Sequence, residues 1–223
     1  ADAIASRTGV PTDVVVAVLE LARAEGLVVE RTGRAPGWSL TAAGRAEGMR
    51  LLALEVHERG AAEAMGAAYR RFRTVNEPFL AVCTRWQLRA VDGASVPNDH
   101  SDLAHDEAVL AELDALHQVV VNEVTVPASG ALDRFGSYPT RFEHAIGRLR
   151  AGELDWFTRP MIDSYHTVWF ELHDDLLATL GLDRASDRVA DDGDPQREPM
   201  HATLPGRDQT GRAGDVVGPA YEE

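Results

Sequence analysis

Apolar positions recur at helical spacing along most of the chain. Residues 11–25 carry an apolar side chain at every third or fourth position, which predicts an amphipathic helix. A short helix is expected before it over residues 1–8, with Gly9 at the turn between the two. Gly26 is expected to end the second helix. The side chains predicted to face the core are Ile4 and Ala5 from the first helix, and Val15, Val18, Leu19 and Ala22 from the second.

A small β-hairpin is predicted directly after these helices. Residues 27–31 are rich in β-forming side chains, and residues 38–40 are their expected partner. The intervening TGRAPG holds two glycines and a proline, which suit a turn. Thr41 is expected to cap a new helix. The predicted order over residues 1–45 is therefore helix, turn, helix, hairpin and the start of a helix.

The following residues, up to 182, are predicted to be mainly helical. The expected helices cover residues 42–58, 61–75, 76–91, 102–125, 137–151 and 160–181. A helix restart or a kink is placed at Asn76, because Pro78 cannot donate a hydrogen bond to the preceding turn. VDGASVPNDHSD is predicted to be a loop, and VPASG a helix break. The stripe expected along the last helix is Ile162, Tyr165, Trp169, Leu172, Leu176 and Leu180.

Residues 4–45 resemble the winged helix-turn-helix of bacterial regulators and are most similar to the MarR-like group. The resemblance rests on Ala5 and Gly9, on the run VVVAVLELARAEGLV, and on GWSLTAAGR after the hairpin. It covers about a fifth of the chain. It implies a winged helix-turn-helix over residues 1–45. Together with the helical period of the residues that follow, this predicts a mainly α fold with a helical dimerisation or effector domain over 46–182. Residues 183–223, rich in Asp, Gly and Pro, are predicted to be a disordered acidic tail.

The resemblance also implies a function: a cytoplasmic bacterial transcription regulator that binds double-stranded DNA as a homodimer and senses a small-molecule effector. The helix at 11–25 would lie in the major groove, and the wing at 27–40 would contact the backbone or minor groove. The side chains that the resemblance places on DNA are Arg7, Thr12, Asp13, Val16, Ala17, Glu20, Arg23, Arg31 and Arg34.

Composition changes this picture through charge. The chain carries a net charge of −14, all 22 of its basic residues are arginine, and residues 1–50 sum to zero. A neutral reader is a weak electrostatic match for phosphates. The single cysteine, Cys83, suits a reducing compartment, and no apolar run is long enough to cross a membrane.

The alternative function is a winged-helix module that binds protein rather than DNA. The helix that precedes this pair in the family is absent before Ala1, which suggests a fragment of a larger protein. The two functions predict different surfaces. A regulator should gather its arginines on one face, whereas an interaction module should expose an apolar patch there.

Histidines and carboxylates near the end of the helical region suggest a divalent-metal site. Asp163 and His166 are three residues apart, His173 lies two turns further on, and His144 stands on the preceding helix. FEHAIGRLRAGELD and the helix after it resemble the end of the metal-binding effector domain of some GntR-type regulators. The alternative is that these histidines are hydrogen-bonded packing residues beside the apolar stripe.

Aromatic side chains offer a second candidate, an effector pocket between helices formed by Trp86, Tyr165 and Trp169. The alternative is that they belong to the core or to a dimer contact. Catalysis is not predicted, because the chain has no Gly-rich phosphate loop, nucleophile elbow or HExxH motif. Cys83 lies in an apolar helical context and is expected to be a buried thiol.

Overall fold

The first forty residues form the helix–turn–helix and hairpin that their pattern predicts. In the computed structural model, which describes residues 1–33, 36–91 and 93–182, helix α1 spans Asp2–Thr8 and α2 spans Thr12–Ala24. Gly9 and Gly26 adopt φ values of 70° and 72°, the left-handed conformation that ends each helix. Strands β1 (Val28–Arg31) and β2 (Gly37–Leu40) pair antiparallel, with Val28 opposite Leu40. We call residues 1–40 the N-terminal unit.

Helix α3 (Ala42–Glu58) links the N-terminal unit to the rest of the chain. Thr41 caps it as predicted, because its side chain accepts a hydrogen bond from the Gly44 backbone N–H at 3.0 Å. The expected domain boundary at residues 45–46 falls inside this helix. Since α3 packs against both β2 and α9, it belongs to both parts of the fold.

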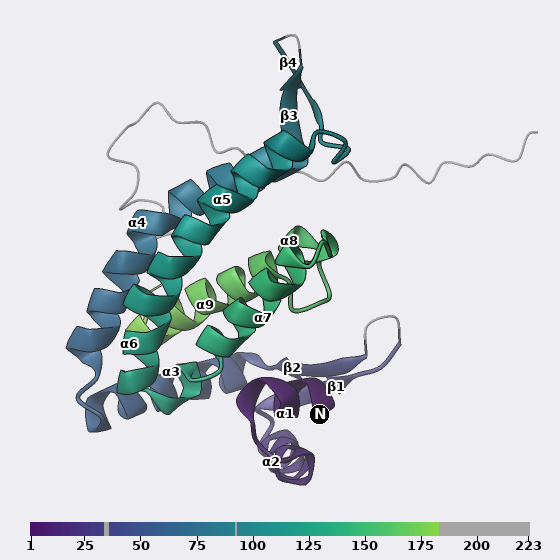
Figure 1. Ribbon diagram of the computed structural model, residues 1–223. Helices are drawn as coiled ribbons and strands as arrows, with labels where there is room; N and C mark the ends of the chain where they lie inside the picture. Colours follow the sequence, from purple (N-terminus) through teal and green to yellow (C-terminus); the bar gives the residue numbers. More distant parts are fainter. Residues whose placement is uncertain (34–35, 92, 183–223) are drawn as a thin grey trace, which may run out of the picture.

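The remaining described residues form a helical body. Two long helices, α4 (Ala62–Gln87) and α5 (Leu103–Val119), run side by side, and α9 (Tyr165–Leu180) packs with α4 and α7 (Tyr138–Arg150) (Figure 1). Shorter elements connect them: a π-helical segment (Val120–Thr125), α6 (Val126–Ala131), a 3₁₀ turn (Asp133–Phe135) and α8 (Asp155–Thr158). The core is aromatic, and its fully buried rings include Phe72, Phe79, Phe142, Phe157, Tyr165 and Trp169.

The restart predicted at Asn76 is wrong, because α4 continues through Pro78 as one helix. Proline removes the hydrogen bond to the Thr74 carbonyl, but Thr74 and Pro78 are both exposed, so water can reach that oxygen. Val75, Phe79 and Val82 continue the buried stripe across the proline. Packing of this stripe outweighs the lost hydrogen bond.

The end of the helix predicted over 76–91 and the loop predicted after it are also wrong, since α4 ends at Gln87 and a second hairpin follows. Strands β3 (Leu88–Val91) and β4 (Ala94–Pro97) pair antiparallel and project away from the body (Figure 1). Asn98 anchors the base of this hairpin: its backbone N–H donates to the Gln87 carbonyl at 2.8 Å, and its side chain donates to Asp106 Oδ1 at 2.8 Å. The Asp-Gly sequence at 92–93 is a hairpin signal that the loop prediction did not use.

Two helix boundaries differ from the expected ones. The VPASG segment does not break the chain, because α6 follows the π-helical segment without a gap and Pro127 lies where the two join. The last helix begins at Tyr165 rather than at residue 160, since Ser164 caps it by accepting from the Thr167 backbone N–H. Met161 has a φ of 70°, so residues 160–164 are not helical and Ile162 is outside the apolar stripe of α9.

The mainly helical fold class is confirmed for the described ranges, which also hold the two hairpins. None of their helices is long and apolar enough to cross a membrane. The predicted tail, residues 183–223, lies outside the described residues.

Candidate functional site

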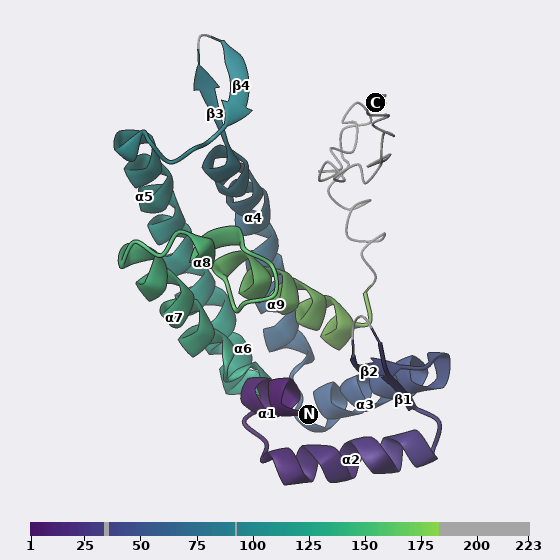
Figure 2. The same cartoon turned by 90° about the vertical axis from the view of Figure 1, so that its right-hand side faces the viewer.

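Helix α2 lies at the outer edge of the molecule, away from the helical body (Figure 2). Val15 and Leu19 point into the small core of the N-terminal unit together with Val28 from β1. Val18, predicted to join them, is 57% exposed instead. The side chains expected to face DNA from this helix are all exposed: Thr12, Asp13, Val16, Ala17, Glu20 and Arg23.

The arginines expected to bind phosphate are largely engaged by carboxylates of the same chain. Arg7 pairs with Glu171 of α9 at 2.9 Å, and Arg23 pairs with Glu20 on its own helix. Arg31 is exposed on β1 and has no ion pair among the described residues, whereas Arg34 lies outside them. The arginines therefore do not form a single positive face over the described part of this unit.

A second exposed side of α2 is apolar. Val18 and Leu21 lie four and seven residues after Val14, so all three share one side of the helix. Their exposed fractions are 46%, 57% and 67%. This stripe lies beside the core-facing side chains and away from the polar residues expected to contact DNA. Helix α2 thus exposes an apolar stripe beside a core whose own side chains are buried.

A chain of ion pairs joins α1 to the helical body. Arg141 of α7 is mostly buried and binds both oxygens of Asp163, at 2.9 and 2.6 Å, and also Glu171 at 2.5 Å. Glu171 in turn binds Arg7. Burial alone would raise the pKa of Asp163, but the hydrogen bonds and charge of Arg141 hold that pKa below its ordinary value. Asp163 is therefore ionised and paired with Arg141 near neutral pH.

A cavity of about 520 Å³ opens beside these ion pairs, where α1 meets the start of α7 and the segment before α9. Serine, threonine and arginine side chains line it together with small and apolar ones. The lining residues are Ala3, Ser6, Arg7, Ser137, Thr140, Arg141, Met161, Ile162 and Asp163.

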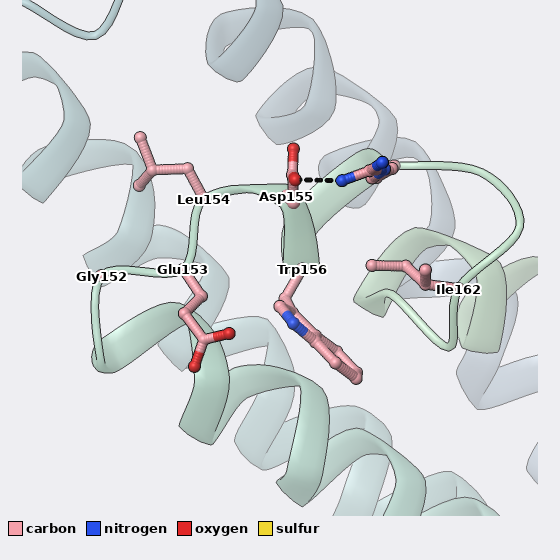
Figure 3. Close-up of a pocket in the computed structure, with 7 residues that line it drawn as sticks. Gly152, Glu153, Leu154, Asp155, Trp156 and Ile162 are labelled. Atoms are coloured by element: carbon pink, nitrogen blue, oxygen red, sulfur yellow. Dashed lines mark hydrogen bonds and ion pairs between the residues drawn. The ribbon is translucent and has the colours of Figure 1, made fainter.

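Another cavity, of about 540 Å³, is formed by the loop around α8. In Figure 3, Glu153 and Trp156 point to one side of this loop, while Asp155 points to the other and pairs with Arg159. The Trp156 ring stacks on His144 at 4.9 Å between centroids, and the Arg148 guanidinium lies 5.0 Å from the same ring. The acidic lining is paired with arginine, because Glu153 binds Arg148.

The residues proposed for a metal site are not brought together. Asp163 is held by Arg141 and His144 by Trp156, as described above, while His166 packs against Phe170 at 4.4 Å and His173 against Phe72 at 4.9 Å. Within the described ranges, no group of three or more His, Cys, Asp or Glu side chains could hold a metal ion. The packing role fits the surroundings of His166 and His173.

The burial of His166 makes stability depend on pH. Burial lowers the pKa of His166 below its ordinary value, so the unfolded chain binds a proton at a higher pH than the folded chain. We expect the free energy of unfolding to decrease as the pH falls through about 6.5, and a His166→Gln variant to lose less over the same interval. Urea unfolding at pH 7.5 and pH 5.5 measures both values. Equal losses in the two proteins would contradict this assignment.

The aromatic residues proposed for an effector pocket belong to the core. Trp86, Tyr165 and Trp169 are all at most 3% exposed and line neither cavity described above. They pack against Phe79 and Phe157, which fill the space that a ligand would need. Cys83 is buried as expected, and burial raises the pKa of its thiol to about 12, so it is not a thiolate nucleophile.

Two features near these sites were missed in the sequence. Arg141 shares a helix side with the buried Tyr138 and Ala145, three and four residues away, and that spacing on an apolar stripe is a usable signal for a buried, paired arginine. His117 is 1% exposed and contacts Glu143 at 3.2 Å and the Tyr165 hydroxyl at 3.4 Å, a long-range grouping that no local pattern indicates.

Comparisons with protein-family models, with curated proteins and with solved structures found no match to this chain.

Proposed function

We propose that this protein is a DNA-binding transcription regulator of the bacterial cytoplasm, in which α2 enters the major groove and the β1–β2 hairpin acts as the wing. The observation that carries the proposal is the order helix, turn, helix, hairpin, with the polar side of α2 exposed at the outer edge of the molecule (Figure 2). A second helix presented in this way is the reading element of helix-turn-helix proteins. Since one such helix reads few bases, we also propose a homodimer joined through the helical body.

The charges on this surface predict that DNA binding is weak and depends little on salt concentration. Arg23 must give up its contacts with Glu20 and Glu30 before it can bind phosphate, and Arg7 must give up Glu171. Arg31 is the described arginine best placed to bind phosphate without such a loss. Each phosphate contact contributes a slope of about −0.9 to the plot of log K against log salt concentration. We expect a total slope of about −2 for the dimer, one contact per subunit.

The test is titration of random duplex DNA at two salt concentrations, with Arg31→Ala beside the native chain. We expect the variant to bind at least tenfold more weakly at low salt and to lose most of the salt slope. Arg50→Ala is the matched control, because Arg50 is an exposed arginine on α3 that pairs with Glu47 outside the proposed surface. No binding by the folded native chain at low salt would refute the proposal.

The exposed stripe of Val14, Val18 and Leu21 favours a second candidate, a module that packs an apolar helix of another protein against α2. The two candidates use different sides of α2, so they can be separated by mutation. A Val18→Gln, Leu21→Gln variant should retain DNA binding if α2 reads DNA. Two results together would support the interaction module instead. The native chain would not bind DNA, and a partner protein that co-purifies with the native chain would be lost from the variant.

A further inference from the structure

The cavity between α1 and α7 has a lining rich in hydrogen-bond donors. Arg7 and the hydroxyl-bearing residues Ser6, Ser137 and Thr140 line the same space of about 520 Å³. None of these three hydroxyls has a hydrogen-bond partner among the described residues. Cavities of this volume are typical of sites for small organic molecules. The polar part of the lining is therefore suited to a ligand group that accepts several hydrogen bonds.

The charges in this cavity are arranged so that Arg7 can change partners. Asp163 does not repel an incoming anion strongly, because Arg141 binds both of its oxygens. Glu171 is shared between Arg7 and Arg141. If Arg7 turns to a ligand, Glu171 keeps its contact with the mostly buried Arg141 and is not left as an unpaired charge. The Arg7 side chain is 51% exposed, so its rearrangement needs no change in the core.

The remaining lining is apolar and partly open. Ala3, Ile162 and Met161 form this part, and Met161 is 98% exposed with a φ of 70°. A fully exposed methionine in a left-handed conformation is uncommon, and covering its side chain removes apolar surface from water. A ligand that fills the cavity should thus carry an apolar group beside its anionic one.

We propose that this cavity binds a phosphate monoester of a small apolar molecule. A phosphoryl group offers three terminal oxygens to the guanidinium of Arg7 and to the three hydroxyls, which is a better match in number than the two oxygens of a carboxylate. The organic part lies against Ala3, Met161 and Ile162. The site combines the N-terminal unit, through Ser6 and Arg7, with the helical body, through Ser137 and Thr140.

The ligand would also change how α1 is held. The Arg7–Glu171 ion pair is a direct link between α1 and α9. A phosphoryl group that takes Arg7 replaces this link with contacts to the first turn of α7. An effect of this change on DNA binding rests on the proposed function, whereas ligand binding itself does not, so the two are measured separately.

The first experiment is isothermal titration of the native chain with phenyl phosphate, inorganic phosphate and benzoate at constant ionic strength. We expect phenyl phosphate to bind at least tenfold more tightly than either of the others, because only it supplies both the phosphoryl and the apolar group. Arg7→Gln should weaken phenyl phosphate binding at least tenfold, and Thr140→Ala about threefold. Arg50→Gln should leave the affinity unchanged, because Arg50 is an exposed arginine that is not among the residues lining the cavity.

A Glu171→Gln variant tests the exchange of partners, because Glu171 competes with the ligand for Arg7 and the substitution weakens that competition. We expect it to bind phenyl phosphate more tightly than the native chain, with thermal unfolding confirming that it is folded. Equal affinity of the native chain and Arg7→Gln would overturn the site. Tighter binding of benzoate than of phenyl phosphate would overturn the phosphoryl assignment. A DNA titration with and without phenyl phosphate then tests the link to α1, and its failure would leave the binding result intact.

Discussion

A Gly44→Ala substitution should destabilise the N-terminal unit by about 3 kcal/mol, although it adds a single methyl group. A Cβ at residue 44 would lie 1.9 Å from the Leu27 carbonyl oxygen and 2.8 Å from its carbon. Both are backbone atoms, so no side-chain rotation can relieve the clash. The same carbonyl accepts hydrogen bonds from the Thr41 backbone N–H at 2.9 Å and from the Thr41 hydroxyl at 3.2 Å. Moving it away would break the junction between the hairpin and α3.

Hydrogen exchange measured by mass spectrometry would locate this effect. We expect faster exchange over residues 1–40 in Gly44→Ala and unchanged protection in α4 and α5, because the clash is confined to the junction. Gly48→Ala is the matched control, since Gly48 lies on the same helix and a Cβ there would meet no other part of the protein within 4 Å. It should stabilise the protein by about 0.5–1 kcal/mol through helix propensity. Equal stability of the two variants would contradict the close approach.

A Trp169→Ala substitution should cost about 4 kcal/mol of unfolding free energy, the largest loss that we expect from one side chain. Trp169 is 1% exposed, and its ring stacks on Phe79 with 4.0 Å between the centroids. Its Nε1–H donates to Asn76 Oδ1 at 2.9 Å. The substitution would leave a large cavity between α4 and α9 and remove the donor from Asn76.

Urea denaturation followed by circular dichroism measures this loss. Trp169→Phe keeps most of the buried ring but not the N–H donor, so we expect an intermediate cost of about 1–2 kcal/mol. Met161→Ala is the surface control and should change stability by less than about 0.5 kcal/mol, because Met161 is 98% exposed. If Trp169→Ala were no less stable than Met161→Ala, the aromatic cluster would not be the core of the body.

The site residues differ in how far they could be predicted. Thr12, Glu20 and Arg23 lie on one exposed side of α2, as the helical period indicates. The ion pair of Arg7 with Glu171 joins residues 164 positions apart, and no sequence period relates them. No sequence period relates Asp163 to Arg141 either. Asp163 was predicted as a metal ligand, but Arg141 binds it. Residue type alone does not say whether a carboxylate will meet a cation of its own chain.

The sequence alone determined the two helices and the hairpin of the N-terminal unit and the mainly helical character of the rest, because those depend on local signals: apolar period, Gly9 and Gly26 at helix ends, and the Thr41 cap. Tertiary structure decided the continuity of α4 through Pro78, the burial of Trp86, Tyr165 and Trp169, and the engagement of the arginines. These outcomes depend on packing between segments far apart in the chain, which can outweigh a local preference such as the helix-breaking tendency of proline. The energy that settles them comes from contacts that exist only once the helices have assembled.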